Sequence, residues 1–353
     1  MMIRLRSITP RSLLVIIALC ALALFRAREL CAQDLRGEDV GPEGTRSQDL
    51  EAGNYPSKPI HIVVPFPADG PTDLLARVIG KEMTASWGRA VLIDNRPGAD
   101  TAIGAEMVAK ASPDGYTLLA GLDSTMVLNP LLMKNLPYDT SKDFEPISLL
   151  ARNVPLLEVR ADSSVHSVQD LIEALKAKPG KLNLGVGTSN SRLAALLLAR
   201  QTGTTLTIVP YIGGMETVEG LSNGSIDVAI ASAASSLPLI TAGKLRPLAK
   251  FSDLPLAKLQ HLPLVAAATG APALGGFSTW VGLFAPAGTS REITGKLANF
   301  IATIYADPAV AKRLDDAGII AVSSTPAELV TLAGSDAERW DKIIRDNGIS
   351  NLE

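Results

Sequence analysis

The segment Gly187-Thr-Ser-Asn-Ser191 carries the residues that come nearest to an arrangement for covalent catalysis. A nucleophile elbow needs the pattern Gly-x-Ser-x-Gly, because the serine sits on a tight turn between a strand and a helix. Ser191 stands where the second glycine is required. The chain has three histidines, at positions 61, 166 and 261, and His61 lies in a run of β-branched residues that is typical of a strand. These features disfavour Ser-His-Asp hydrolysis.

The common cofactor and metal motifs are absent from the sequence. Gly185-Val-Gly187 is similar to the start of a dinucleotide fingerprint, but Asn190 replaces the third glycine and no acidic residue follows about 20 positions later. The chain also lacks a phosphate-binding Gly-Lys-Ser/Thr segment and a pair of histidines at helical metal-ligand spacing. We therefore expect no cofactor, no bound metal and no enzymatic activity, and we interpret residues 187–191 as a loop that binds a polar ligand.

The elements that would position such a loop are clearest at residues 60–87. The β-branched run 60–64 predicts a strand, and Pro65, which has no N–H group, should end it. After a loop rich in proline and glycine, apolar residues recur at helical spacing and predict a helix capped by Asp69 or Thr72. A helix that starts after a buried strand presents free N–H groups and the positive end of its dipole, which suits an anion or a polar ligand.

The first 32 residues have the features of a secretory signal peptide. Arginines precede an uncharged apolar run from Leu13 to Phe25, which at 13 residues is too short for a membrane span of roughly 20. We expect cleavage between Ala27 and Ala32, most simply after Ala32, and a periplasmic mature protein. Both cysteines lie in this segment, so the mature chain would have no disulfide and no thiol nucleophile.

Composition and charge narrow the range of partners. Removal of residues 1–32 takes away five arginines and one glutamate, which leaves 28 basic and 35 acidic residues and a formal net charge of −7. This balance favours solubility and argues against nucleic acid or an anionic membrane surface as a partner. Residues 33–54 are polar and have too few apolar side chains to form a core, so we interpret them as a flexible tether.

The remaining chain of about 300 residues is long enough for two domains. Strand-like and helix-like runs alternate along it, which is typical of the α/β class. Small and hydroxyl residues follow several predicted strands, in the loops 95–100, 122–125, 187–191, 213–214 and 232–236. A helix predicted from Arg192 follows the third of these loops. Ligands of α/β proteins bind at such strand ends, so the sequence predicts a binding cleft without a catalytic group.

Ten short motifs, in order along the chain, resemble those of one protein family. They are Tyr55-Pro-Ser-Lys-Pro59, Val64-Pro-Phe-Pro67, Gly70-Pro-Thr-Asp73, Asn95-Arg-Pro-Gly-Ala99, Ile103-Gly-Ala105, Pro113-Asp-Gly-Tyr-Thr-Leu118, Leu136-Pro-Tyr-Asp139, Val209-Pro-Tyr211, Ala242-Gly-Lys-Leu-Arg246 and Ala285-Pro-Ala-Gly-Thr289. The family is that of the substrate-binding proteins of tripartite tricarboxylate transporters. The resemblance runs from about Tyr55 to the C-terminus.

The resemblance implies a periplasmic solute receptor with a two-domain, type II-like periplasmic-binding-protein fold. Two α/β domains, joined by a hinge that the chain crosses twice, would close on the solute. The expected boundaries are 55–152 with 282–353 for the first domain and 153–281 for the second. The receptor would deliver a small organic solute, usually a carboxylate, to the permease subunits of the transporter, without catalysis. We expect a monomer.

The ligand loops of the family map onto six segments of this sequence. The resemblance thereby implies that the ligand is bound by Phe66, Ala68, Asp69, Gly70, Thr72, Asp73, Asp100, Thr101, Ala102, Asp123, Ser124, Thr125, Gly187, Thr188, Ser189, Ser191, Arg192, Tyr211, Gly213 and Ala231. Several positions depart from the usual pattern of the family. Asp69 and Asp100 replace common glycines, Asp123 replaces a small or hydroxyl residue, Arg192 replaces a histidine, Ile212 a lysine and Ala231 an aspartate.

The departures leave the class of solute open. If Asp69, Asp100 and Asp123 met at the mouth of the cleft, they would repel a carboxylate and attract an amine. Arg192, from the other domain, would instead pair with a carboxylate. A carboxylate and an amine-bearing or zwitterionic acid are both compatible with this sequence. The alternatives to a transport receptor are a sensor that presents its closed form to a membrane kinase and a secreted hydrolase that uses Ser189 or Ser191.

Overall fold

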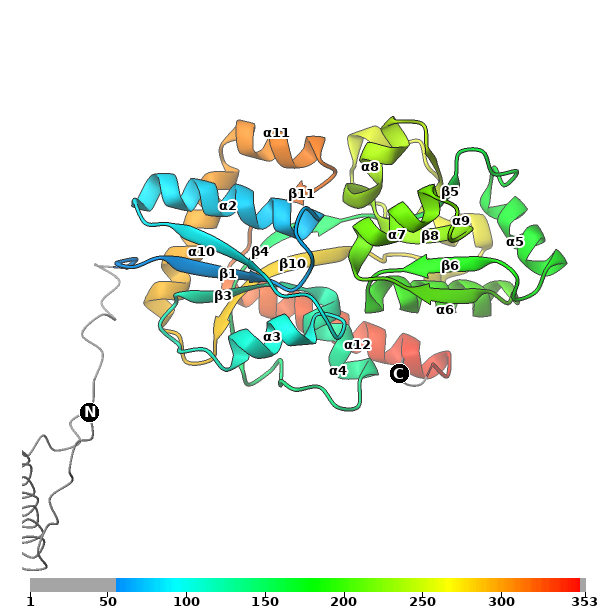
Figure 1. Cartoon of the computed structure of the whole chain (residues 1–353). Helices are drawn as coiled ribbons and strands as arrows, with labels where there is room; N and C mark the ends of the chain where they lie inside the picture. The colour runs from blue at the N-terminus through cyan, green and yellow to red at the C-terminus, as the bar shows by residue number, and fades with distance from the viewer. Residues whose placement is uncertain (1–54, 350–353) are drawn as a thin grey trace, which may run out of the picture. The chain divides into compact units, whose positions relative to one another are not determined.

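Two β-sheets organise the part of the chain that the structure describes (Figure 1). The structure is a computed structural model and describes residues 55–349. The first sheet has the strand order β11-β4-β10-β3-β1-β2, and the second has the order β7-β6-β8-β5-β9. Helices pack on both sheets, so the predicted α/β class is confirmed. The predicted signal peptide and tether lie outside the described residues.

The first sheet and its helices form what we call lobe 1. Its strands are β1 (Ile60–Val64), β2 (Val91–Asn95), β3 (Thr117–Leu122), β4 (Phe144–Asn153), β10 (Thr279–Pro286) and β11 (Ile320–Ala321). Its helices are α2 (Pro71–Trp87), α3 (Ala102–Ala109), the π-helix η2 (Ser124–Leu128), α4 (Asn129–Leu132), α10 (Arg291–Tyr305), α11 (Pro308–Asp316) and α12 (Pro326–Asp346). Strand β1 pairs in parallel with β2 and β3, whereas β10 runs antiparallel to β3 and β4.

The second sheet and the helices around it form lobe 2. Its strands are β5 (Pro155–Arg160), β6 (Asn183–Val186), β7 (Thr207–Pro210), β8 (Val228–Ser232) and β9 (Leu245–Lys250). Its helices are α5 (Val168–Ala177), α6 (Ser189–Thr202), α7 (Gly213–Ser222), α8 (Ala233–Thr241), α9 (Val265–Thr269) and the 3₁₀ turns η3 (Ala257–Leu259) and η4 (Pro272–Leu274). Among residues 55–349 no helix is both long and apolar enough to cross a membrane.

Strand β1 is buried on both faces, which explains its continuous run of apolar, mostly β-branched residues. Ile60, Ile62 and Val64 belong to the core that includes α2 and α10, whereas Val63 points to the opposite face, where α3 packs. Pro65 follows the last paired residue, as predicted. This strand therefore ends at a fixed point, and the loop after it leads directly into α2.

The chain passes between the two sheets twice, as the predicted fold requires. Strand β4 ends at Asn153, and β5 begins two residues later at Pro155. The return passes from β9, which ends at Lys250, to β10, which begins at Thr279. Thr279 is the register partner of Asn153, so the two crossings lie side by side. The division into hinged domains at 152/153 and 281/282 stays a prediction.

Three local predictions were wrong, each at the start of a helix. Helix α6 begins at Ser189 rather than at Arg192, because Thr188 and residue 191 form a capping box. Helix α2 has Gly70 as its N-cap and no side-chain cap, so neither Asp69 nor Thr72 caps it. Residues 122–125 are not a loop, because β3 continues to residue 122 and η2 follows directly.

Truncation of a core leucine tests the arrangement of lobe 1. Leu119 is 0 % exposed in β3, whereas Leu92 in β2 is 45 % exposed. We expect Leu119→Ala to lower the free energy of unfolding by about 2–5 kcal/mol, because it leaves a cavity. Leu92→Ala, the matched control, should change it by about 0.5 kcal/mol or less. Urea denaturation of both variants measures the difference, and equal losses would contradict this core.

Candidate functional site

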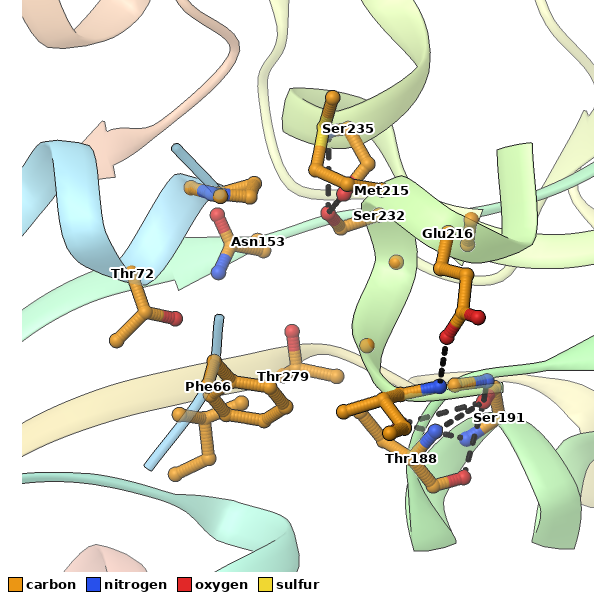
Figure 2. A pocket seen from close by; sticks show the side chains of 18 of the residues that line it. Phe66, Thr72, Asn153, Thr188, Ser191, Met215, Glu216, Ser232, Ser235 and Thr279 are labelled. Atoms are coloured by element: carbon orange, nitrogen blue, oxygen red, sulfur yellow. Dashed lines mark hydrogen bonds between the residues drawn. The ribbon is translucent and has the colours of Figure 1, made fainter. Parts of the chain in front are cut away.

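A cavity of about 450 Å³ lies between lobe 1 and lobe 2 (Figure 2). Lobe 1 lines it with the loop after β1, the first turn of α2, and residues at the end of β4 and the start of β10. Lobe 2 lines it with the first turns of α6, α7 and α8. Four helix N-termini therefore meet at one cavity, and their dipoles favour negative charge there.

The four N-termini differ in whether a side chain already caps them. In α6, Thr188 Oγ1 accepts a hydrogen bond from the N–H of Ser191 at 3.2 Å. In α8, Ser232 Oγ accepts one from the N–H of Ser235 at 3.3 Å. The N-caps of α2 and α7 make no side-chain hydrogen bond of this kind. The first turns of α2 and α7 thus have the more accessible N–H donors.

Glycines allow the loops of lobe 2 to approach one another around the cavity. A Cβ atom on Gly187 would lie 2.4 Å from the carbonyl group of Gly213, which no side chain allows. Gly213 has a φ of 83°, in the left-handed region that favours glycine. The N–H of Gly213 donates to the carbonyl oxygen of Gly187 at 3.1 Å, which joins the starts of α6 and α7.

The lining combines apolar and polar side chains but contains no lysine, arginine or histidine among the described residues. Phe66, Ile212, Met215 and Ile230 supply apolar surface. The charged lining residues are Glu216 and Glu219, both exposed, on the first two turns of α7. Glu216 Oε2 accepts a hydrogen bond from the N–H of Ile212 at 2.6 Å.

The structure brings nine of the twenty predicted site residues together at the cavity. These nine are Phe66, Ala68, Gly70, Thr72, Gly187, Thr188, Ser191, Gly213 and Ala231. The other eleven do not line it. They are Asp69, Asp73, Asp100, Thr101, Ala102, Asp123, Ser124, Thr125, Ser189, Arg192 and Tyr211.

Asp73 stabilises the loop before α2 instead of facing the cavity. Its Oδ2 accepts hydrogen bonds from Arg77 Nε at 2.7 Å and from the N–H of Asp69 at 3.0 Å, and its Oδ1 accepts one from Asn95 Nδ2 at 3.0 Å. Burial acts to raise the pKa of Asp73, but the hydrogen bonds from Arg77, Asn95 and Asp69 outweigh it and hold that pKa below its usual value. Asp73 is therefore an ionised anchor for the loop.

Asp69, Asp100 and Asp123 do not meet at the mouth of the cleft. Asp69 is exposed, with a φ of 66°. Asp100 accepts a hydrogen bond from the hydroxyl of Ser189, and Asp123 Oδ2 accepts one from Asn190 Nδ2 at 2.9 Å. Two of the three acids thus bind the first turn of α6, which links lobe 1 to lobe 2.

Burial raises the pKa of both linking carboxyl groups. Asp123 is 1 % exposed, and burial, together with the charge of Asp336, raises its pKa to about 8. Burial also raises the pKa of Asp100, although the hydrogen bond from Ser189 and the charge of Arg192 oppose the shift. Arg192 acts here on a neighbouring carboxyl group and not on the cavity.

Other predicted residues make structural contacts instead of lining the cavity. Thr101 Oγ1 and Thr125 Oγ1 lie 2.8 Å apart, and Tyr138 donates its hydroxyl to the carbonyl oxygen of Thr125 at 2.8 Å. Ser124 is 0 % exposed in η2. Tyr211 packs against Gly220, where a Cβ atom would lie 2.5 Å from the tyrosine hydroxyl. These side chains hold the elements that carry the cavity.

Sequence reasoning missed several polar lining residues. They are Asn153, Asn190, Glu216, Glu219, Ser232, Ser235 and Thr279. Asn153 and Thr279 are adjacent only because β4 pairs with β10, across more than a hundred residues of chain. The loop 232–236 had been recognised as small and hydroxyl-rich, so Ser232 and Ser235 had a signal in the sequence.

The geometry offers no hydrolase site at the cavity. Ser191 Oγ accepts hydrogen bonds from the N–H groups of Gly187 and Thr188, both at 3.1 Å. No histidine lines the cavity, and His61 Nδ1 lies 2.8 Å from Asp94 Oδ2, between β1 and β2. Within the described residues no group of three His, Cys, Asp or Glu side chains is placed to hold a metal ion.

Two α/β lobes around a cavity at facing helix N-termini define a solute-binding receptor. The chain belongs to the family described as "Tripartite tricarboxylate transporter family receptor", whose model matches residues 75–349. This family consists of periplasmic solute-binding receptors and not of enzymes, which confirms the resemblance inferred from the sequence motifs.

Relatives support the assignment over most of the chain. A protein of Pseudomonas sp. strain P51, named "UPF0065 protein in tcbD-tcbE intergenic region", is 39 % identical over 306 residues, covering 85 % of this chain and 89 % of that protein. BugT of Bordetella pertussis is 32 % identical over 305 residues, covering 85 % of this chain and 92 % of BugT. The solved structure of Rpa4515 of R. palustris with adipate has a TM-score of 0.80 at 33 % identity, covering 84 % of this chain and all of that one.

The link between Asp123 and Asn190 predicts a pH dependence of stability. Unfolded aspartate has a pKa of about 3.9, whereas that of folded Asp123 is about 8. Between these values the folded state keeps a proton that the unfolded state releases, so this group lowers stability progressively as the pH rises. Asp123→Asn removes the effect, and its melting temperature relative to the unaltered protein should therefore increase from pH 5 to pH 8.

Melting curves across this pH range measure the difference for Asp123→Asn. The control is Asp162→Asn, which changes a carboxylate whose side chain is 69 % exposed. The difference in melting temperature between Asp162→Asn and the unaltered protein should stay constant from pH 5 to pH 8. A constant difference for Asp123→Asn as well would show that this carboxyl group titrates normally.

Proposed function

We propose that this protein is exported through cleavage of residues 1–32, binds a small organic acid between its lobes in the periplasm, and delivers it as a monomer to the permease subunits of a tripartite transporter. The observation that carries the proposal is the cavity of about 450 Å³ bounded by helix N-termini from both lobes. Its volume and mixed lining suit a single small solute.

The N-termini of α2 and α7 support a carboxylate as the group that is recognised. Both helices start at the cavity without a side-chain cap, and they approach it from opposite lobes. A carboxylate can accept hydrogen bonds from both, and each helix dipole stabilises it. Solved relatives agree with this class of ligand, since Rpa4515 was solved with adipate and MatC of Rhodopseudomonas palustris, which is 28 % identical, with malate.

An amine-bearing or zwitterionic acid is a second candidate for the solute. Glu216 and Glu219 are the charged residues of the lining, and no basic side chain balances them there among residues 55–349. An ammonium group near α7 would gain from these carboxylates, although solvent exposure keeps the gain small. The carboxylate of the same solute would still face the N-terminus of α2.

Ligand capture would work through a shift between an open and a closed form. Ser189 and Asn190 of lobe 2 bond to Asp100 and Asp123 of lobe 1 in the structure described here. Such bonds stabilise the closed form only in part, because the buried carboxyl groups lose their solvation. Contacts that the solute adds on closing would then shift the population toward the closed form.

A solute screen tests this function directly. We expect one or more organic acids or amino acids to raise the melting temperature, because a ligand at 100 times its Kd stabilises the folded state by about 2.7 kcal/mol. X-ray scattering at saturation should show a smaller radius of gyration. Simple amines without a carboxylate serve as the control set and should give no shift.

Two outcomes of the screen would contradict the proposal. The first is no melting shift with any acid, combined with turnover of ester or amide substrates, which would favour the hydrolase alternative. The second is a tightly bound acid that leaves the radius of gyration unchanged, which would overturn closure while retaining solute binding.

A further inference from the structure

The two walls of the cavity differ in whether their polar side chains already have hydrogen-bond partners. In lobe 2, Thr188 Oγ1 and Ser191 Oγ lie 3.2 Å apart, and Ser232 Oγ and Ser235 Oγ lie 3.0 Å apart. In lobe 1, three lining side chains have no hydrogen bond to any residue between 55 and 349, namely Thr72, Asn153 and Thr279. A solute therefore finds three unpaired polar side chains on lobe 1. On lobe 2 the Oδ1 of Asn190 is also buried without a partner, but as an acceptor it cannot bind a carboxylate.

Asn153 is the most informative of these three side chains. It is 6 % exposed, and its Oδ1 is buried without a partner. Buried amide groups are almost always hydrogen-bonded, because an unpaired one loses its bonds to water without replacement. The unpaired Oδ1 can only accept a hydrogen bond and so cannot bind a carboxylate. The Nδ2 of the same side chain also has no partner among residues 55–349 and lies on the side of Thr72 and Thr279 in Figure 2, so it can donate to a carboxylate that arrives with the solute.

The three side chains converge although they come from three elements. Thr72 lies in the first turn of α2, Asn153 ends β4, and Thr279 begins β10 as the register partner of Asn153. Figure 2 shows their polar ends directed toward the same part of the cavity. Two hydroxyl groups and an amide can together donate three or more hydrogen bonds. The uncapped N-terminus of α2 adds a positive dipole end at the same place.

On the opposite side of the cavity, two acidic side chains oppose the dipole of the uncapped N-terminus of α7. Ile212 offers apolar surface there, and Phe66 adds apolar surface from lobe 1. Glu216 and Glu219 lie beside this apolar surface on α7. A carboxylate at this end would meet two like charges and no basic side chain among the described lining residues.

We infer that Thr72, Asn153 and Thr279 form the subsite that holds the solute's carboxylate, and that the far end of the preferred solute carries no second carboxylate. This inference rests on the proposed function, since it names the part of the same cavity that recognises the acid. The solute class is then a monocarboxylate with an apolar body, or one with a cationic far end, rather than a dicarboxylate or tricarboxylate.

Calorimetry with probes of equal chain length tests the solute class. The probes are hexanoate, adipate, 6-aminohexanoate and the uncharged hexanamide. We expect hexanoate or 6-aminohexanoate to bind the unaltered protein at least tenfold more tightly than adipate, and hexanamide to bind more weakly than hexanoate. Adipate as the tightest probe would overturn the inference about the far end.

Two variants test the subsite itself. Asn153→Leu keeps the side-chain size but removes the amide, and Thr279→Val removes a hydroxyl while keeping the shape. We expect Asn153→Leu to lower the affinity for the tighter-binding probe, hexanoate or 6-aminohexanoate, tenfold or more. Thr279→Val should lower the same affinity at least threefold. The matched control is Thr331→Val on α12, outside the cavity, which should leave affinity within twofold.

The outcomes separate this inference from the proposed function. Unchanged affinity of Thr279→Val and of Asn153→Leu, with normal melting curves, would overturn the subsite. If Asn153→Leu fails to fold, the affinity of Thr279→Val alone tests the subsite. Failure of all four probes, in a protein that binds another acid from the screen, would overturn the inference alone. Failure of every acid would overturn the proposed function as well.

Discussion

The antiparallel pairing of β10 with β4 is the interaction on which the rest of the structure depends. It places the two chain crossings side by side, because Thr279 opposes Asn153 at the ends of these strands. Trp280, the next residue of β10, is 0 % exposed and donates its indole N–H to Asp336 Oδ2 on α12 at 2.8 Å. The pairing, fixed by this buried anchor, sets where lobe 2 leaves and rejoins lobe 1, and so where the cavity forms.

A second constraint is that hydroxyl residues after a strand serve two purposes. In α6 and α8 they cap the helix, whereas Thr72 in α2 is left without a side-chain partner. Capping and ligand binding use the same residue types, since both supply hydrogen bonds at a helix start. The difference lies in which neighbouring side chains are within reach, and that depends on backbone geometry.

The sequence was sufficient for the fold class and for the loops that reach the cavity. The β-branched run of β1 and the alternation of strands and helices indicated the α/β class, and the predicted residues Phe66, Thr188 and Gly213 line the cavity. Asn153 and Thr279 could not be predicted, because they are adjacent only through a register that no local pattern specifies. The roles of Asp100 and Asp123 could not be predicted either, because their partners depend on packing against α6.

Buried acids are a general feature of this chain. Glu158 in β5 is 0 % exposed, and its Oε1 accepts a hydrogen bond from Ser236 Oγ on α8 at 2.6 Å. Burial raises the pKa of Glu158 to about 8. With Asp123, it gives each lobe one carboxyl group that is mostly protonated at neutral pH. A neutral carboxyl group can donate a hydrogen bond as well as accept one, so burial makes these side chains ordinary polar partners instead of charges.

The position of Asn153 and Thr279 at the two crossings has a mechanical consequence. If the lobes rotate about these crossings, points near the axis move least, and a group held there keeps its contacts throughout the motion. Helix α7 has no such place on the axis, so its contacts with a solute would form only as the rotation ends. Asn153 and Thr279, which would move little, would then bind the solute first, and α7 would contact it only on closing. The association rate would depend on the first set of contacts and the dissociation rate on the second.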